Sequence, residues 1–106
     1  MNPAWRDRAK MILYHVTTEK KAKRYRQSGK ILKPVRGFTT LLAAMAWAMK
    51  CGRKVIYLIE VPKDSAHKLP DHHNKYGEAW WTEDDVYRFV CEYSAGGNFE
   101  PEEGEK

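Results

Sequence analysis

The sequence has little cysteine and no long apolar segment, and each shortage excludes a class of protein. Its two cysteines, Cys51 and Cys91, are too few for a disulfide scaffold or for a complete thiolate metal site. The longest apolar run, residues 41–49, is about half as long as a membrane span. The first ten residues carry four charged side chains and no apolar stretch like that of a signal peptide. We therefore expect a soluble, cytoplasmic protein with no membrane partner.

Aromatic and apolar residues are plentiful enough for one folded domain. The 106 residues include 4 Trp, 6 Tyr and 3 Phe, and 42% of the chain is hydrophobic. A chain of this length buries roughly 65% of its unfolded surface, which supports a single core. We expect an N-terminal extension over residues 1–10, one domain over residues 11–94, and an acidic, disordered tail over residues 95–106.

Charge is distributed unevenly between the two halves of the chain. Residues 1–54 carry fourteen lysines and arginines against two acids, a net charge of +12, and residues 55–106 carry five against twelve, a net charge of −7. Such asymmetry is typical of a protein with a basic binding face. An uneven distribution of ordinary surface charge explains it equally well, so both interpretations stay open.

Apolar patterning and capping residues predict an α+β domain. Short apolar or β-branched runs indicate strands, threonines ahead of helical segments indicate helix starts, and Gly29 and Gly52 indicate helix ends. The predicted strands cover residues 11–16, 55–61, 79–82 and 86–93, the helices cover about 19–28 and 41–50, and loops cover 31–38, with a very short strand, and 63–78. The predicted fold is therefore a single small α+β domain with a mixed β-sheet and two main helices.

Three short motifs follow one another along this framework. They are Leu13-Tyr14-His15-Val16-Thr17 at the end of the first strand, Gly37-Phe38-Thr39-Thr40 before the Ala-rich helix, and Glu78 ahead of Ala-Trp-Trp-Thr. This order resembles the ADP-ribosyltransferase superfamily, in its small bacterial, phage or RNA 2′-phosphotransferase-like forms. The resemblance spans residues 12–93 and implies an ADP-ribosyltransferase-like fold. It also implies NAD as the substrate whose ADP-ribose is transferred to a protein or nucleic-acid acceptor.

The resemblance also assigns residues to the NAD site. His15 matches the residue that holds the ribose of NAD, with the Thr17 hydroxyl beside it. The second motif matches the residues that shape the nicotinamide pocket, and an aromatic side chain can hold the nicotinamide ring by stacking. The implied NAD-binding residues are Tyr14, His15, Thr17, Gly37, Phe38 and Thr39.

The third motif supplies the catalytic acid. Breaking the bond between nicotinamide and ribose develops positive charge on the ribose, which a fixed carboxylate stabilises. Glu78 matches the family position best, and Glu92 in the last strand is the rival. His15 and Glu78 are therefore the implied catalytic residues. The family's usual Tyr in the second motif is absent.

Basic side chains crowd the first helix and its end, and they support an alternative function. They are Lys20, Lys21, Lys23, Arg24, Arg26 and Lys30. Such a cluster could follow a phosphate backbone, which would make the protein a non-catalytic nucleic-acid-binding module. A solvated helix face in a basic protein has the same pattern. Tyr25, which lies among these cations, is expected to face the core.

Histidines gather in the polar segment, where His67, His72 and His73 accompany Asp71. Neutral imidazoles bind zinc, but adjacent histidines point in different directions. No regular spacing to either cysteine completes a ligand set. We therefore expect no metal site.

Overall fold

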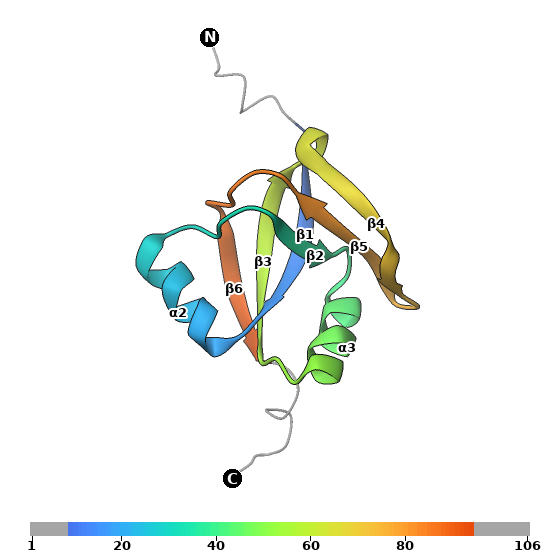
Figure 1. Cartoon of the computed structure of the whole chain (residues 1–106), viewed down its shortest axis with the longest axis horizontal. Coiled ribbons are helices and arrows are strands. Elements are labelled where there is room, and N and C mark those ends of the chain that lie inside the picture. The colour runs from blue at the N-terminus through green and yellow to red at the C-terminus, as the bar shows by residue number, and fades with distance from the viewer. Residues whose placement is uncertain (1–8, 95–106) are drawn as a thin grey trace.

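The structure is a computed structural model that describes residues 9–94, apart from the side chains of residues 72, 73 and 91–94. The predicted tail and residues 1–8 of the predicted extension lie outside this part of the chain. Its elements, in chain order, are β1 (Lys10–Thr17), α2 (Glu19–Ser28), β2 (Val35–Phe38), α3 (Leu41–Cys51), β3 (Val55–Pro62), the 3₁₀ turn η1 (Lys63–Ser65), β4 (Ala66–Asn74), β5 (Gly77–Thr82) and β6 (Phe89–Ser94) (Figure 1).

Six strands form one sheet in the order β4-β5-β2-β1-β3-β6. All five neighbouring pairs are antiparallel. The α+β class and the two main helices are as predicted, but the predicted mixed sheet is wrong. The physical reason lies in the connections: β2 and β3 flank β1 on its two sides, and each runs opposite to it, so the strands joined through helices never pair in parallel.

Local chemistry sets the limits of both helices. The Thr18 hydroxyl accepts a bond from the Lys21 amide at 3.2 Å, and Thr40 accepts one from the Ala43 amide at 3.1 Å. These bonds satisfy amides that have no partner within the first turn of a helix. Gly29 and Gly52, with φ of 76° and 72°, end the helices in the left-handed region that favours glycine.

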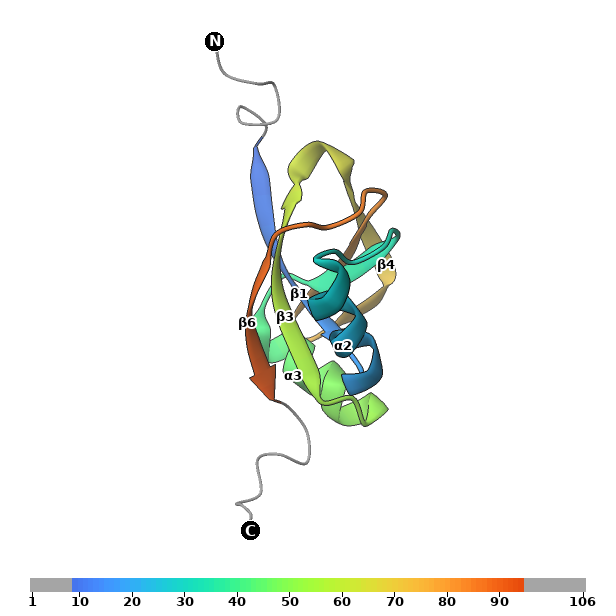
Figure 2. The ribbon, with the colours of Figure 1, turned by 90° about the vertical axis from the view of Figure 1, so that its left-hand side faces the viewer.

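The two helices cover opposite faces of the sheet. Successive strand residues point to opposite faces, and Ile56 packs with Ala43, Ala44 and Ala48 of α3, whereas Tyr57 belongs to the cluster that contains Ala22 of α2. Figure 2 shows α2 standing out from the central strands on one side. The core therefore consists of two apolar layers, one on each face of the sheet.

The segment 63–78 differs from its prediction as a loop, because it contains η1, all of β4 and the start of β5. β4 lies at the edge of the sheet, where a polar sequence and a proline are tolerated. The predicted strand 86–93 also starts later, at Phe89. Val86 instead forms an isolated bridge with Ile31, with N–O distances of 2.8 and 2.9 Å.

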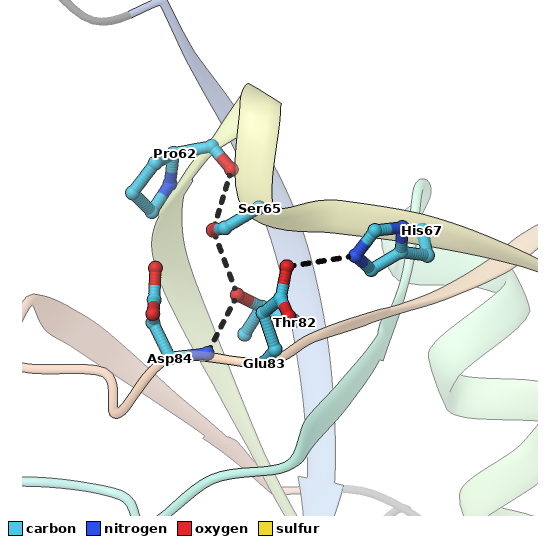
Figure 3. Close-up of polar contacts among 6 residues, drawn as sticks. All are labelled: Pro62, Ser65, His67, Thr82, Glu83 and Asp84. Atoms are coloured by element: carbon cyan, nitrogen blue, oxygen red, sulfur yellow. Dashed lines mark hydrogen bonds and ion pairs between the residues drawn. The ribbon is translucent and has the colours of Figure 1, made fainter.

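A buried hydroxyl pair joins η1 to the end of β5 (Figure 3). Ser65 Oγ donates to the Pro62 carbonyl at 3.1 Å and lies 3.1 Å from Thr82 Oγ1. Because the Ser65 proton is committed to Pro62, Thr82 donates to Ser65 and accepts from the Asp84 amide at 3.3 Å. Within residues 9–94, no helix has the length and apolar character needed to span a membrane.

Candidate functional site

A cleft of about 880 Å³ opens where β1 and β2 diverge. α2 and the loop that follows it contribute many of the lining residues, and α3 contributes Trp47. Its apolar lining comes mainly from Ile31, Leu32, Pro34, Phe38, Trp47 and Leu69, and its cationic residues are Lys21, Arg24, Lys30, Arg36 and Arg53. The cleft thus combines flat apolar surfaces with concentrated positive charge.

The cleft has charge of one sign among the residues that the structure describes. No Asp or Glu of this part of the chain is among the residues that line it. Within the described part of the chain, none of its five cationic residues makes an ion pair. Clefts lined by charge of one sign focus the field and attract ligands of the other sign. The cleft is therefore suited to an anionic ligand.

His15 lies in the cleft at the end of β1, and its hydrogen bonds define its tautomer. Nδ1 lies 2.7 Å from the carbonyl oxygen of Arg36, which can only accept, so Nδ1 carries the proton. Nε2 of the neutral ring is then an acceptor, and it receives the Tyr25 hydroxyl at 3.2 Å. Thr17 Oγ1 donates to the same phenolic oxygen at 3.4 Å. A chain of three hydrogen bonds therefore runs from Thr17 through Tyr25 and His15 to the β2 backbone.

Burial lowers the pKa of His15 from its ordinary value of 6.5 to about 4. The bond to Arg36 raises this pKa, and the charges of Lys21 and Arg53 lower it further. His15 is therefore neutral at pH 7. Lys21 and Arg53 line the same cleft as His15.

Gly37 allows β2 to approach β1 closely. A Cβ at this position would lie 2.8 Å from the Cβ of Leu13 and 3.1 Å from the carbonyl oxygen of Tyr14. Leu13 is fully buried, so neither neighbour has room to move away. Gly37 lines the cleft, as expected for the second motif, and the structure gives it a packing role there.

The other predicted NAD-binding residues divide between the cleft and its supports. Phe38 lines the cleft, with its ring centroid 6.1 Å from that of Trp47. Thr17 is buried and acts through Tyr25, whereas Tyr14 packs against the α3 cluster and is not among the lining residues. Thr39 accepts a bond from the Glu78 amide at 3.1 Å and so joins β5 to the start of α3.

The carboxylate of Glu78 is engaged outside the cleft lining. One oxygen lies 2.9 Å from Lys68 Nζ, and the other accepts from Trp80 Nε1 at 3.1 Å. Glu78 is not among the residues that line the cleft. The side chain of its rival, Glu92, lies outside the described residues. The structure therefore brings His15, Gly37 and Phe38 together without bringing the Glu78 carboxylate to them.

The basic residues of α2 and its end fall into two groups. Lys21, Arg24 and Lys30 line the cleft, whereas Lys20, Lys23 and Arg26 do not. Arg26 Nη1 donates to the Tyr57 hydroxyl at 3.3 Å. Only part of the predicted nucleic-acid-binding set therefore belongs to the cleft.

Several residues of the site were not among the predicted NAD-binding residues, and they include Tyr25, Trp47 and Arg53. Tyr25 contacts the apolar core as expected, but it also lines the cleft, and its hydroxyl bonds to His15. Trp47 follows the helical pattern of a buried segment, and Arg53 follows the helix-ending glycine. Neither position carries a sequence signal that distinguishes a cleft residue from an ordinary helix or turn residue.

The histidine-containing segment forms a smaller polar contact. His67 Nε2 lies 3.1 Å from Glu83 Oε2 (Figure 3). The His67 ring is tilted by 36° against that of Trp81, with the ring centroids 4.8 Å apart. Among the side chains that the structure describes, no three His, Cys, Asp or Glu residues are grouped as metal ligands. The side chains of His72 and His73 are not among them.

Comparison of the chain with protein-family models, with curated proteins and with solved structures found no match. The resemblance to ADP-ribosyltransferases therefore stays a prediction from the motifs.

Proposed function

We propose that the cleft binds NAD, or another phosphorylated nucleotide, and that the domain is an ADP-ribosyltransferase-like protein that transfers ADP-ribose to a protein or nucleic-acid acceptor. One observation carries the proposal: within residues 9–94, five cationic residues without ion-pair partners line a cleft, and no described acid lines it. The order of the three motifs supports NAD as the nucleotide.

The chemistry of NAD fits the two kinds of surface in the cleft. A pyrophosphate carries negative charge, which Lys21 and Arg53 beside His15 can neutralise. The nicotinamide and adenine rings are flat, and the half-buried Trp47, which packs on the buried ring of Phe38, offers aromatic surface. Neutral His15 adds no further charge at pH 7, and its bond to Arg36 keeps it at the point where the strands diverge.

The geometry supports binding more directly than transfer. Transfer requires a group that stabilises the positive charge on the ribose as its bond to nicotinamide breaks. For Glu78 to fill that role, its carboxylate must exchange Lys68 and Trp80 for the ligand. Binding and nicotinamide release are therefore separate measurements.

Titration of the ¹⁵N-labelled protein with NAD tests the binding step. We expect amide shifts at residues 15–25, 36–38 and 53. The double substitution Lys21→Gln/Arg53→Gln is expected to weaken binding at least about tenfold, because two charge-assisted contacts are lost. The control Lys54→Gln/Lys63→Gln removes the same charge from exposed sites off the cleft lining. Equal loss in both double variants, or no shift at saturating NAD, would contradict the proposal.

Nicotinamide release from NAD tests the transfer step. We expect release that falls in Glu78→Gln while NAD affinity is retained. Binding without any release would leave a nucleotide-binding domain and would remove the transferase part of the proposal.

A further inference from the structure

The outward face of α2 carries a stripe of polar side chains that includes three cations, one of which also lines the cleft. Lys20, Lys23, Arg24 and Gln27 follow the spacing i, i+3, i+4, i+7 and are all exposed, and we call this set the outer stripe. It lies opposite Ala22, the residue of α2 that is fully buried against the sheet. Lys20 and Lys23 belong to the outer stripe alone, whereas Arg24 and Gln27 also line the cleft.

The cations of the outer stripe repel one another in the free protein. Lys20 lies three residues before Lys23 and four before Arg24, and like charges at these spacings destabilise a helix by about 0.2–0.5 kcal/mol per pair. None of the three makes an ion pair within residues 9–94, and α2 holds one acid, Glu19, against these three cations. A bound polyanion would relieve this repulsion, so helix stability and polyanion binding are coupled.

The position of the stripe identifies the class of polyanion. Arg24 joins it to the cleft, where Tyr25 and Trp47 are half-buried and contribute aromatic surface. Unpaired bases stack on aromatic side chains while phosphates follow cations, and the bases of a duplex cannot reach such rings. A lipid surface requires exposed apolar side chains beside the cations, and α2 exposes none.

We propose that the outer stripe of α2 binds the phosphate backbone of a single-stranded nucleic acid that runs towards the cleft. The proposal goes beyond nucleotide binding by the cleft, and the phosphate contacts of the outer stripe do not require NAD to bind there. The helix is about 15 Å long, enough for two or three phosphates. The three cations predict a salt dependence, the slope of log K against log salt concentration, of about −2, since each phosphate contact of a single strand contributes about −0.7.

Fluorescence anisotropy with a labelled oligothymidylate, measured over a series of salt concentrations, tests the proposal. We expect Lys20→Gln/Lys23→Gln to reduce the magnitude of the salt slope by about 1.4 and to weaken strand binding. The same variant should keep the NAD affinity of the unmodified protein, because neither residue lines the cleft. The control Lys54→Gln/Lys63→Gln should keep the strand affinity within about twofold, the shift expected from net charge alone.

Other polyanions complete the test. An oligoglutamate peptide of equal charge, a DNA duplex and vesicles with anionic lipid should each bind more weakly than the oligothymidylate at the same salt concentration. A salt slope near zero, equal losses in the two double variants, or peptide, duplex or vesicle binding as tight as strand binding would overturn the proposal. Oligothymidylate binding without NAD binding would uphold this inference and contradict the proposed function. NAD binding without oligothymidylate binding would contradict this inference and leave the proposed function standing.

Discussion

His15 donates a 2.7 Å hydrogen bond from Nδ1 to the main-chain carbonyl of Arg36. The bond crosses from β1 to β2 at the point where the two strands diverge beside the cleft. It links the two strands through a side chain, and it fixes which ring nitrogen is protonated. The same imidazole therefore supports the fold and forms part of the candidate site.

The first prediction concerns the pH dependence of stability. The pKa of His15 is lowered to about 4 in the folded protein and is near 6.5 in the unfolded chain, so the unfolded chain binds the proton first as the pH falls. The contribution of His15 to the free energy of unfolding is therefore complete above pH 6.5 and is lost progressively between pH 6.5 and 4. The loss is about 3 kcal/mol at most, because each unit of pKa shift corresponds to 1.36 kcal/mol.

Urea unfolding between pH 7.5 and 4 measures this dependence. In His15→Gln the difference from the unmodified protein should shrink as the pH falls from 6.5 to 4. The matched control His67→Gln changes an exposed histidine, and its free energy of unfolding should still fall between pH 6.5 and 4 as in the unmodified protein. Parallel curves for His15→Gln and the unmodified protein would show that His15 is not the titrating group.

The second prediction concerns the hydroxyl of Tyr25. Tyr25→Phe keeps the ring but removes the donor to His15 Nε2 and the acceptor for the buried Thr17 hydroxyl. The expected loss is about 1–2 kcal/mol in the free energy of unfolding, the typical cost of leaving a buried polar group unpaired. Side-chain ¹⁵N NMR should show the Nε2 resonance of His15 moving towards that of a free acceptor nitrogen. Tyr87→Phe, at a residue that is 66% exposed, is the control and should change neither quantity.

The parts of the fold that depend on neighbouring residues in sequence could be predicted. The threonine caps and the terminating Gly29 and Gly52 act within one helical turn, so their chemistry is visible in the sequence itself. Strand direction depends on which segments pair, and nothing in the run 55–61 specifies whether it lies parallel or antiparallel to its neighbour. β4 was missed because a polar edge strand containing Pro70 lacks the apolar alternation of a half-buried strand.

The candidate site divides in the same way. His15, Gly37 and Phe38 stand in recognisable motifs and line one cleft. Tyr25 joins them only because α2 packs back over the end of β1. The helix periodicity places Tyr25 on the core-facing side, but it does not reveal this contact with His15. Glu78 has two side-chain partners. Lys68 reaches it through the β4–β5 pairing, which the sequence did not predict, and Trp80 lies two residues further along the same strand.

The third prediction distinguishes two reasons why a position requires glycine: close packing at Gly37 and a positive φ at Gly29. Gly37→Ala places a Cβ against Leu13 and the Tyr14 carbonyl, and overpacking of this kind costs about 1–3 kcal/mol. Gly29 has open space around it but a φ of 76°, so Gly29→Ala costs about 1 kcal/mol through the backbone alone. Asn tolerates that conformation better than Ala does. Gly29→Asn should therefore be milder than Gly29→Ala, whereas Gly37→Asn should be worse than Gly37→Ala. Urea unfolding of the four variants measures this reversal, and the same order at both sites would contradict the assigned causes.

The fourth prediction concerns the buried hydroxyls of Ser65 and Thr82, which are 5% and 0% exposed. Thr82→Val removes the donor to Ser65 Oγ and the acceptor for the Asp84 amide, and we expect it to lower the free energy of unfolding by about 1–3 kcal/mol. Ser65→Ala removes the hydroxyl that donates to Pro62 and should cost about 1 kcal/mol.

Because the two hydroxyls contact each other, the double variant should cost less than the two single variants together by at least about 0.5 kcal/mol. Chemical denaturation of the four proteins closes this cycle. The pair Thr82→Val and Tyr87→Phe, which share no contact, serves as the additive reference. Additive losses for Ser65 and Thr82 would mean that each hydroxyl stabilises the fold through its backbone partner alone, and that the contact joining η1 to β5 contributes nothing of its own.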